Sequence, residues 1–410
     1  MTTVRRCAAA LVASAVLGLT AAPAALAAPS PSPSADLPTG LYGTGDPTYD
    51  GVWRQSLALL AQDTADVRPA KSAVGFLTGQ QCASGGFPSY RADTAKDCDA
   101  ELPLDTNASA AAVQALAALG GQDAVVKKTV DWLKSVQNKD GGWGYNPGGA
   151  SDANSTSVVI GALAAAGGRP ADAKSEAGRT PYDALLTFAK PCGGKDGGAF
   201  VYQVGTPGIV ADSTAAAVLA AHGKGLAATG DDATDAKGTA CEKTTSLEGA
   251  AHNGAAHLAN GLAKTGHFDT PPMPGADDTS PKPDFGNTAD AVVALSVQGL
   301  TEQAKKPLEW LRKNSAAWAK ENGPAAYAQL IFAARAAGAD PKDFGGTDLV
   351  TALSATGPAP QAAATASRAA EDEKKADDSS SFSTWWIVAV FFVAAMGAGF
   401  LLSGRRKNQS

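Results

Sequence analysis

Residues 133–143 read LKSVQNKDGGW, and this stretch decides the fold that the sequence predicts. The same order of Leu, Gln, two glycines and an aromatic residue occurs 56 residues earlier, as LTGQQCASGGF over residues 77–87. A partial third copy, KDGGAF, spans residues 195–200. Each glycine pair follows an amphipathic helical pattern, which glycine would end by permitting left-handed backbone. A repeat of this length indicates similar units that bury their apolar faces against one another.

A second pattern alternates with the first. Short runs of Asp, Asn, Ser and Thr open Ala-rich apolar segments that end in Gly, and they begin at Asp105, Asp152, Asp212 and Asn287. Such polar residues cap helix N-termini. Helices that are apolar on nearly all sides pack inside another layer. The sequence therefore predicts amphipathic outer helices alternating with apolar inner helices.

Twelve helices are expected between residues 49 and 356, enough to close into two concentric rings of six. Their starts are expected near Trp53, Pro69, Thr106, Ala124, Asn154, Pro181, Asp212, Leu247, Thr288, Gln303, Pro324 and Pro341.

The repeat resembles the QW motif of the prenyltransferase and squalene/terpene-cyclase superfamily. Leu133, Gln137, Gly141 and Trp143 match that motif, and the copy at residues 77–87 has Phe in place of Trp. The resemblance covers roughly residues 50–355 and implies an all-α, (α/α)6 toroid.

The DANST segment at residues 152–156 opens an apolar helix that ends AAGGRP. It is similar to the helical domain of transcobalamin and intrinsic factor. That likeness implies a corrinoid-like ligand. Those relatives clamp the corrinoid with a second, β-rich domain. Here we expect a corrinoid to be bound either weakly or with a partner that supplies the other face.

The catalytic motifs of the superfamily do not match this sequence. The acidic D-x-D-D motif of triterpene cyclases does not occur, and aromatic residues make up only 6% of the chain, few for stabilising a carbocation. Protein prenyltransferases bind zinc through Asp, Cys and His, but the cysteines here are better explained as disulfides. The Cys-Gly-Glu-Gln thioester motif is also missing. We therefore expect a non-enzymatic protein with no metal and no cofactor.

A binding site is expected where the inner helices begin, because their N-termini and polar side chains would converge on one concavity. The candidate rim residues are Asp105, Asn107, Asp152, Asn154, Asp212, Asn287 and Asp290. Helix capping is the alternative role for these side chains, worth about 0.5–2 kcal/mol each.

Two groups of aromatic residues follow the glycine turns. Phe87, Trp143 and Phe200 belong to the repeat itself and are expected to pack in the core. The second group lies further along each loop and supplies candidate ligand contacts: Tyr90, Tyr145 and Tyr202.

Four cysteines, besides Cys7 in the leader, give an even count in an oxidising compartment and predict two disulfides. Three pairings are possible. Proximity in the sequence favours Cys82–Cys98 and Cys192–Cys241.

Both ends of the chain carry targeting patterns. Residues 1–27 have the basic start, short apolar stretch and A-x-A site of a signal peptide. Residues 384–403 are expected to span a membrane, and the basic tail at 404–410 would lie in the cytoplasm. A flexible lead-in (28–48) and a disordered stalk (357–383) would flank the helical domain, which this topology places outside the cell.

The net charge of −6 disfavours nucleic acid as a partner, because phosphate contacts need Lys and Arg. The segment LSATG at 353–357 resembles a sortase signal, but nearly thirty residues separate it from the predicted membrane helix.

These patterns predict a single-pass cell-membrane protein whose ectodomain captures a small ligand for a membrane importer. Two alternatives stay open. A membrane-anchored glycan hydrolase would use two inner-helix aspartates across a sugar ring, and a structural or interaction module of the cell envelope would need no cavity. A deep pocket with two facing carboxylates would favour the enzyme, a wide mouth with aromatic residues would favour binding, and a plugged ring would favour the structural module.

Overall fold

The computed structural model describes residues 37–205, 211–231, 233, 236, 238–270 and 280–362. The chain separates into two compact units, Met1–Leu37 and Pro38–Ser410, and the fold described below belongs to the second.

The described residues form thirteen α-helices, one short 3-10 helix and a two-stranded hairpin. The elements are α1 (Gly51–Thr64), α2 (Lys71–Gly79), α3 (Thr106–Leu119), α4 (Asp123–Ser135), α5 (Ala153–Ala165), η1 (Pro170–Asp172), α6 (Pro181–Thr187), α7 (Ala211–Ala221), α8 (Leu247–Leu262), β1 (Phe268–Thr270), β2 (Lys282–Asp284), α9 (Phe285–Val297), α10 (Thr301–Asn314), α11 (Ala316–Asn322), α12 (Pro324–Ala336) and α13 (Leu349–Ser354). The strands pair antiparallel, with Phe268 opposite Asp284.

The expected all-α class is confirmed, and the expected helix starts are close to the observed ones. Each lies within three residues of an observed start except the last, which was expected near Pro341 and is found at Leu349. Helix α11 was not expected.

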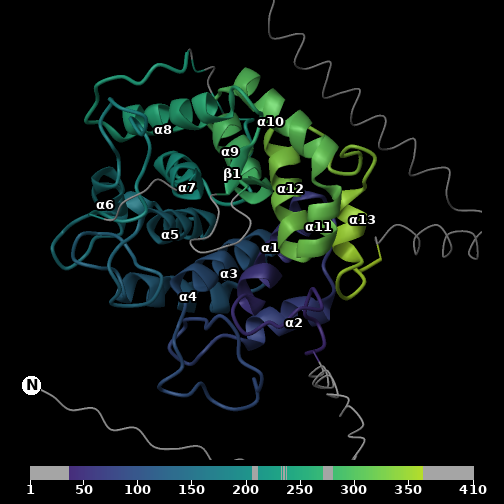
Figure 1. The fold of residues 1–410 in the computed structure, drawn as a ribbon. Helices are drawn as coiled ribbons and strands as arrows, with labels where there is room; N and C mark the ends of the chain where they lie inside the picture. Colours follow the sequence, from purple (N-terminus) through teal and green to yellow (C-terminus); the bar gives the residue numbers. More distant parts are fainter. Residues whose placement is uncertain are drawn as a thin grey trace, which may run out of the picture. The chain divides into compact units, whose positions relative to one another are not determined.

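Six helices form a closed inner ring (Figure 1). Helix α1 packs on α3, α3 on α5, α5 on α7, α7 on α9, α9 on α12, and α12 packs back on α1. Each inner helix also contacts the outer helix that follows it, namely α2, α4, α6, α8, α10 or α13. The predicted alternation of inner and outer helices is therefore confirmed, and the arrangement is that of an α/α toroid.

Side-chain size and polarity separate the two layers. Inner helix α3 is made largely of alanine, and its residues from Ala108 to Leu116 are all buried. Such small side chains allow neighbouring helices to approach on several sides. Outer helix α4 buries only Thr129, Trp132 and Leu133, and its other side faces solvent. The pattern is that of a surface helix with a single apolar stripe.

The repeated turns fasten each outer helix to the next unit. Phe87, Trp143 and Phe200 are fully buried, so their predicted packing role is confirmed. The glycines of these turns lie against the backbone of the next unit. Gly141 has a φ of 95°, and a Cβ at that position would overlap the carbonyl oxygen of Thr180, which caps α6. Only glycine fits such a turn.

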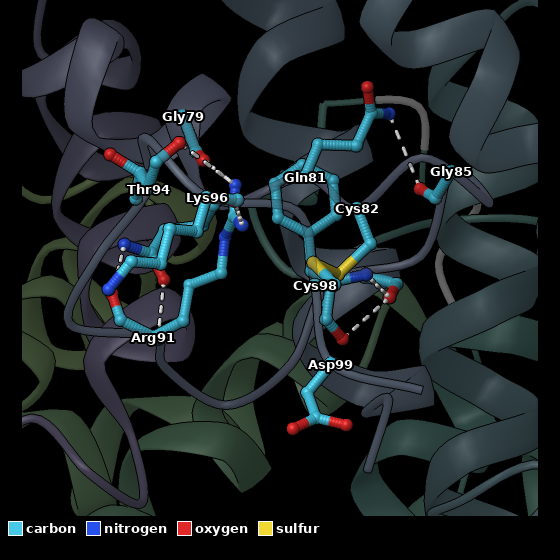
Figure 2. Close-up of a disulfide and its surroundings, with 12 residues drawn as sticks. Gly79, Gln81, Cys82, Gly85, Arg91, Thr94, Lys96, Cys98 and Asp99 are labelled. Carbon is cyan, nitrogen blue, oxygen red and sulfur yellow. Dashed lines mark hydrogen bonds between the residues drawn. A yellow bond between two sulfur atoms is a disulfide. The ribbon is translucent and has the colours of Figure 1, made fainter. Parts of the chain in front are cut away.

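Both expected disulfides, Cys82–Cys98 and Cys192–Cys241, are present. Figure 2 shows the first of them beside Arg91. The Arg91 guanidinium donates to the carbonyl oxygens of Gly79 and Lys96, both at 2.8 Å. The disulfide and this arginine together hold the long loop between α2 and α3.

Replacing both Cys82 and Cys98 by Ser is expected to lower the free energy of unfolding by about 3 kcal/mol, because the bond closes a loop with a sequence separation of 16. Urea unfolding at pH 7 measures this change. The exposed Ser84 in the same loop provides the control, since Ser84→Ala is expected to change stability by less than about 0.5 kcal/mol. Equal stabilities of the double variant and the wild type would contradict the prediction.

The helical domain extends beyond its expected limits at both ends. Tyr42, which was assigned to the flexible lead-in, is fully buried, and its hydroxyl donates to Gln62 at 2.9 Å and to the carbonyl oxygen of Pro358 at 3.4 Å. Gln361 donates to the carbonyl oxygen of Pro69 at 2.7 Å. The lead-in and stalk boundaries are therefore corrected, because residues 38–48 and 357–362 pack against the domain.

The predicted signal peptide and membrane helix lie outside the described residues. Among the helices that are described, none has both the length and the apolar character needed to cross a membrane.

Candidate functional site

A repeated hydrogen bond fixes which positions of the inner helices are equivalent. The backbone N–H of an aromatic residue that precedes each of four inner helices donates to a hydroxyl on that helix. The pairs are Phe87 with Ser109 (2.8 Å), Trp143 with Thr156 (3.1 Å), Phe200 with Thr214 (3.1 Å) and Phe268 with Thr288 (3.0 Å). These hydroxyls give α3, α5, α7 and α9 a common register.

The helix caps lie four residues before these hydroxyls. Asp105 accepts from the backbone N–H of Ala108 at 2.8 Å, and Asp152 accepts from that of Ser155 at 2.7 Å. Asp105 and Asp152 therefore cap their helices, which was the alternative to a binding role. In α9 the cap is Asp284, which accepts from the N–H of Asn287 at 3.0 Å.

The sequence suggested that Asp290 lies at a helix start, but the structure places it elsewhere. Helix α9 begins three residues earlier than expected, at Phe285, because Asp284 caps it. Asp290 consequently lies in the second turn, on the side that faces α12. Its carboxylate accepts two long hydrogen bonds from Gln329 Nε2, at 3.3 and 3.4 Å.

Asp212 also departs from the capping position. It lies two residues before Thr214, a position filled by Asn107 in α3 and Asn154 in α5. Its carboxylate accepts from Asn154 Nδ2 across the helix interface at 3.0 Å, and from the backbone N–H of Ser213 at 2.6 Å. The side chain therefore points toward the neighbouring inner helix.

Asn154, Asp212 and Asp290 meet at an internal cavity of about 180 Å³. The lining residues come from five of the six inner helices and from the loop after α7: Trp53, Leu57, Asn154, Val158, Asp212, Ala215, Ala216, Leu219, Leu226, Asp290, Val293, Gln329 and Phe332. Four of these side chains are polar and belong to positions 154, 212, 290 and 329. The remainder are apolar or aromatic.

The carboxyl groups in this cavity are hard to ionise. Burial, followed by the nearby charges of Asp212 and Asp284, raises the pKa of Asp290 to about 7, although the hydrogen bond from Gln329 opposes the rise. Burial also raises the pKa of Asp212, against the hydrogen bonds from Ser213. The Asp290 side chain lines the cavity, and its raised pKa means that the carboxyl group holds its proton to a higher pH than an exposed Asp does.

The other predicted site residues lie elsewhere. Tyr145 interacts with Asp105, and Tyr202 with Asp152, so both tyrosines sit over the first turns of inner helices. Their backbone carbonyls accept from the N–H groups of Thr106 and Ala153, both at 2.9 Å. These two side chains are 44% and 37% exposed and lie at the rim.

Three further predicted residues do not line the cavity either. Tyr90 packs against Gly51 at the start of α1. Asn287 donates its side chain to its own helix cap, Asp284, at 2.6 Å. Asn107 has a buried Oδ1 with no hydrogen-bond partner among the described residues. Binding by these residues stays a prediction.

Trp53, Gln329 and Phe332 were missed by the sequence reasoning. Gln329 carried a usable signal, because it interrupts the apolar run PAAYAQLIFAA of α12. A polar residue on an otherwise apolar inner helix needs a buried partner, and that partner is Asp290. Trp53 and Phe332 gave no signal that separates a cavity wall from an ordinary core position.

No family model matches this chain. A stretch of 164 residues is 29% identical to drimenyl diphosphate synthase, a terpene cyclase, from Streptantibioticus cattleyicolor. The match covers 40% of this chain and 29% of that protein. This chain therefore spans less than a third of the length of the curated relative that it matches.

Two solved structures are similar at the level of fold. A glycosidase superposes with a TM-score of 0.42 and 15% identity, covering 73% of this chain and 88% of that one. A sugar epimerase from a ruminal bacterium gives 0.41 and 15%, covering 68% and 82%. The closer likeness to the transcobalamin helical domain stays a prediction.

Proposed function

We propose that the protein binds a small, mostly apolar organic molecule in the cavity at the centre of the inner ring. The main support for this proposal is the cavity itself. It has an apolar wall and a polar end formed by Asn154, Asp212, Asp290 and Gln329. Its volume of about 180 Å³ is comparable to that of an engineered protein cavity of about 150 Å³ that binds benzene.

The energetic cost of this cavity supports a functional role. Protein interiors are close-packed, so space left unfilled among the inner helices forfeits packing contacts that larger side chains would make. The carboxyl groups that face it add a desolvation cost. A purely structural ring would be more stable if larger side chains filled its centre. The open cavity therefore disfavours the structural-module alternative.

The size of the cavity also bears on the ligand. A corrinoid is far too large for 180 Å³ and would have to rest on the rim, near Tyr145 and Tyr202. The cavity therefore favours a smaller molecule than the corrinoid-like ligand expected from the sequence. Capture of that molecule at the cell surface for an importer remains part of the proposal. The two disulfides support an oxidising compartment.

Acid catalysis on the bound molecule is a second candidate function. It is favoured by one observation, namely that Asp290 has a pKa of about 7 and faces an apolar cavity beside a second carboxyl group, that of Asp212. A carboxylic acid with a raised pKa is suited to donate a proton at neutral pH. Glycan hydrolysis is less favoured, because most of the cavity wall is apolar.

A cavity-filling substitution tests the binding proposal. Ala216 lines the cavity, and we expect Ala216→Leu to abolish the rise in melting temperature that toluene gives the wild-type protein. Binding to the folded state alone stabilises it by about 2.7 kcal/mol when the ligand is at a hundred times its Kd. Thermal unfolding with and without toluene measures the shift.

The matched control is Ala165→Leu, the same change at an exposed position near the end of α5, which should respond to toluene as the wild type does. If toluene shifted neither the wild type nor the control, the cavity would not be a binding site for apolar molecules. Conversion of an apolar olefin by the wild type and not by Asp290→Asn would establish the catalytic candidate.

A further inference from the structure

The donors and acceptors at the polar end of the cavity indicate which chemical group a bound ligand would need there. Asn154 and Gln329 each direct one amide N–H group to a carboxylate of this region, and each amide has two such donors. Asn154 Nδ2 donates to Asp212 at 3.0 Å, and Gln329 Nε2 donates to Asp290. What these four side chains leave over is mainly acceptor capacity, since a carboxylate offers about four lone-pair sites.

Asp290 is the least satisfied of the four. Its only described hydrogen bonds are those from Gln329, at 3.3 and 3.4 Å, which exceed the usual range for N–H···O of about 2.7–3.2 Å. Asp212, in contrast, accepts short bonds from Asn154 and from the Ser213 backbone. Among the residues that the structure describes, none offers Asp290 a short, strong hydrogen bond.

The charge around the cavity is one-sided. The elements that line it contribute Asp212 from α7 and Asp290 from α9, and Asp284 caps α9 close enough to raise the pKa of both. The cavity-lining residues of α1, α5 and α12 are uncharged. Within the described part of the chain, no Lys or Arg lines this cavity or forms an ion pair with these three aspartates. Buried carboxylates are ordinarily paired with a cation.

We propose that the ligand is a small primary amine with an apolar body, whose ammonium group binds between Asp212 and Asp290. This inference rests on the proposed binding function and specifies the class of ligand. The ammonium group would supply the missing donor and the missing positive charge. Trp53 and Phe332 line the same cavity and provide aromatic surface, to which cations are attracted. The volume of about 180 Å³ limits the ligand to about the size of benzylamine.

Three probes of nearly equal size separate this inference from the general proposal: benzylamine, benzyl alcohol and toluene. Calorimetric titration of the full chain at pH 7 should show that benzylamine binds about tenfold to a hundredfold more tightly than toluene. A charge-assisted hydrogen bond accounts for a difference of this size. Titration in two buffers of different ionisation enthalpy should also show release of a proton, because the ammonium group favours the ionised carboxylate.

Asp290→Asn should remove the preference for benzylamine while leaving toluene binding intact. Asp131→Asn, an exposed carboxylate on outer helix α4, is the matched control and should keep the preference. Equal affinities of the wild type for all three probes would overturn the amine assignment and leave apolar binding standing. Binding of none of them would overturn both. Unchanged benzylamine affinity in Asp290→Asn would overturn the role of Asp290.

Discussion

Above pH 7, the free energy of unfolding of Asp290→Asn is expected to exceed that of the wild type by up to about 4 kcal/mol. The folded protein holds the pKa of Asp290 at about 7, whereas an unfolded Asp has a pKa of about 3.9. Each tenfold difference in proton affinity corresponds to about 1.4 kcal/mol. Between about pH 4 and pH 7 the folded state therefore keeps a proton that the unfolded state has lost.

The sign of the pH dependence follows directly. The stabilising contribution of the neutral Asp290 carboxyl is complete below about pH 4 and is lost as the pH rises through 7. The wild type should thus lose stability over this interval, and Asp290→Asn, which cannot ionise, should lose much less. Asp212 has a pKa raised in the same direction and will leave part of the slope in both proteins.

Urea unfolding of both proteins at pH 5 and pH 8 measures the difference. The comparison between variants is needed because Asp152 and Asp212 also have raised pKa values and contribute a slope of the same sign. Asp131→Asn again serves as the exposed control and should follow the wild type at both pH values. Parallel stabilities of the wild type and Asp290→Asn from pH 5 to pH 8 would show that Asp290 ionises normally.

Gly141→Ala is expected to cost about 2–5 kcal/mol of unfolding free energy. A left-handed backbone costs a non-glycine residue about 1–2 kcal/mol, and φ at Gly141 is 95°. The new Cβ would also overlap the carbonyl oxygen of Thr180, part of the capping box that begins α6. Relief of such an overlap by a backbone shift typically costs about 1–3 kcal/mol more.

Gly148→Ala isolates the first contribution, the backbone cost. Gly148 also has a positive φ, 77°, but no atom lies within 4 Å of its Cβ position. It should therefore show only the backbone cost of about 1–2 kcal/mol. The two variants are compared by urea unfolding at pH 7, where similar losses would mean that the contact with Thr180 contributes nothing.

The fold was largely predictable from the sequence because its signals are local and repeated. The glycine turns after Gln81 and Gln137 mark unit boundaries, and each glutamine side chain donates to the carbonyl oxygen of the first glycine in its own turn. Polar caps such as Asp105 and Asp152 mark the starts of inner helices. The cysteine pairs were accessible to prediction because each joins neighbours in the sequence.

The candidate site was predicted only in part, because it depends on contacts between distant segments. Asp290 was identified, but its role as a cap was wrong, since the true cap is Asp284 and α9 starts earlier than expected. Its partner Gln329 lies on the inner helix that closes the ring. No spacing within either helix reveals that the two side chains face each other. The same holds for Asn154 and Asp212, which meet only because α5 and α7 are adjacent.

Ring closure between α1 and α12 has a consequence for how this chain is made. Open repeat proteins grow from either end, and their terminal units are specialised to face water. Here α1 has one of its two inner-ring neighbours in α3 and the other in α12, more than 250 residues later in synthesis. During translation the apolar flank of α1 stays uncovered until α12 and the segment around Pro358 emerge. The nascent chain thus carries an exposed apolar surface for most of its synthesis, which is the circumstance in which chaperones are needed.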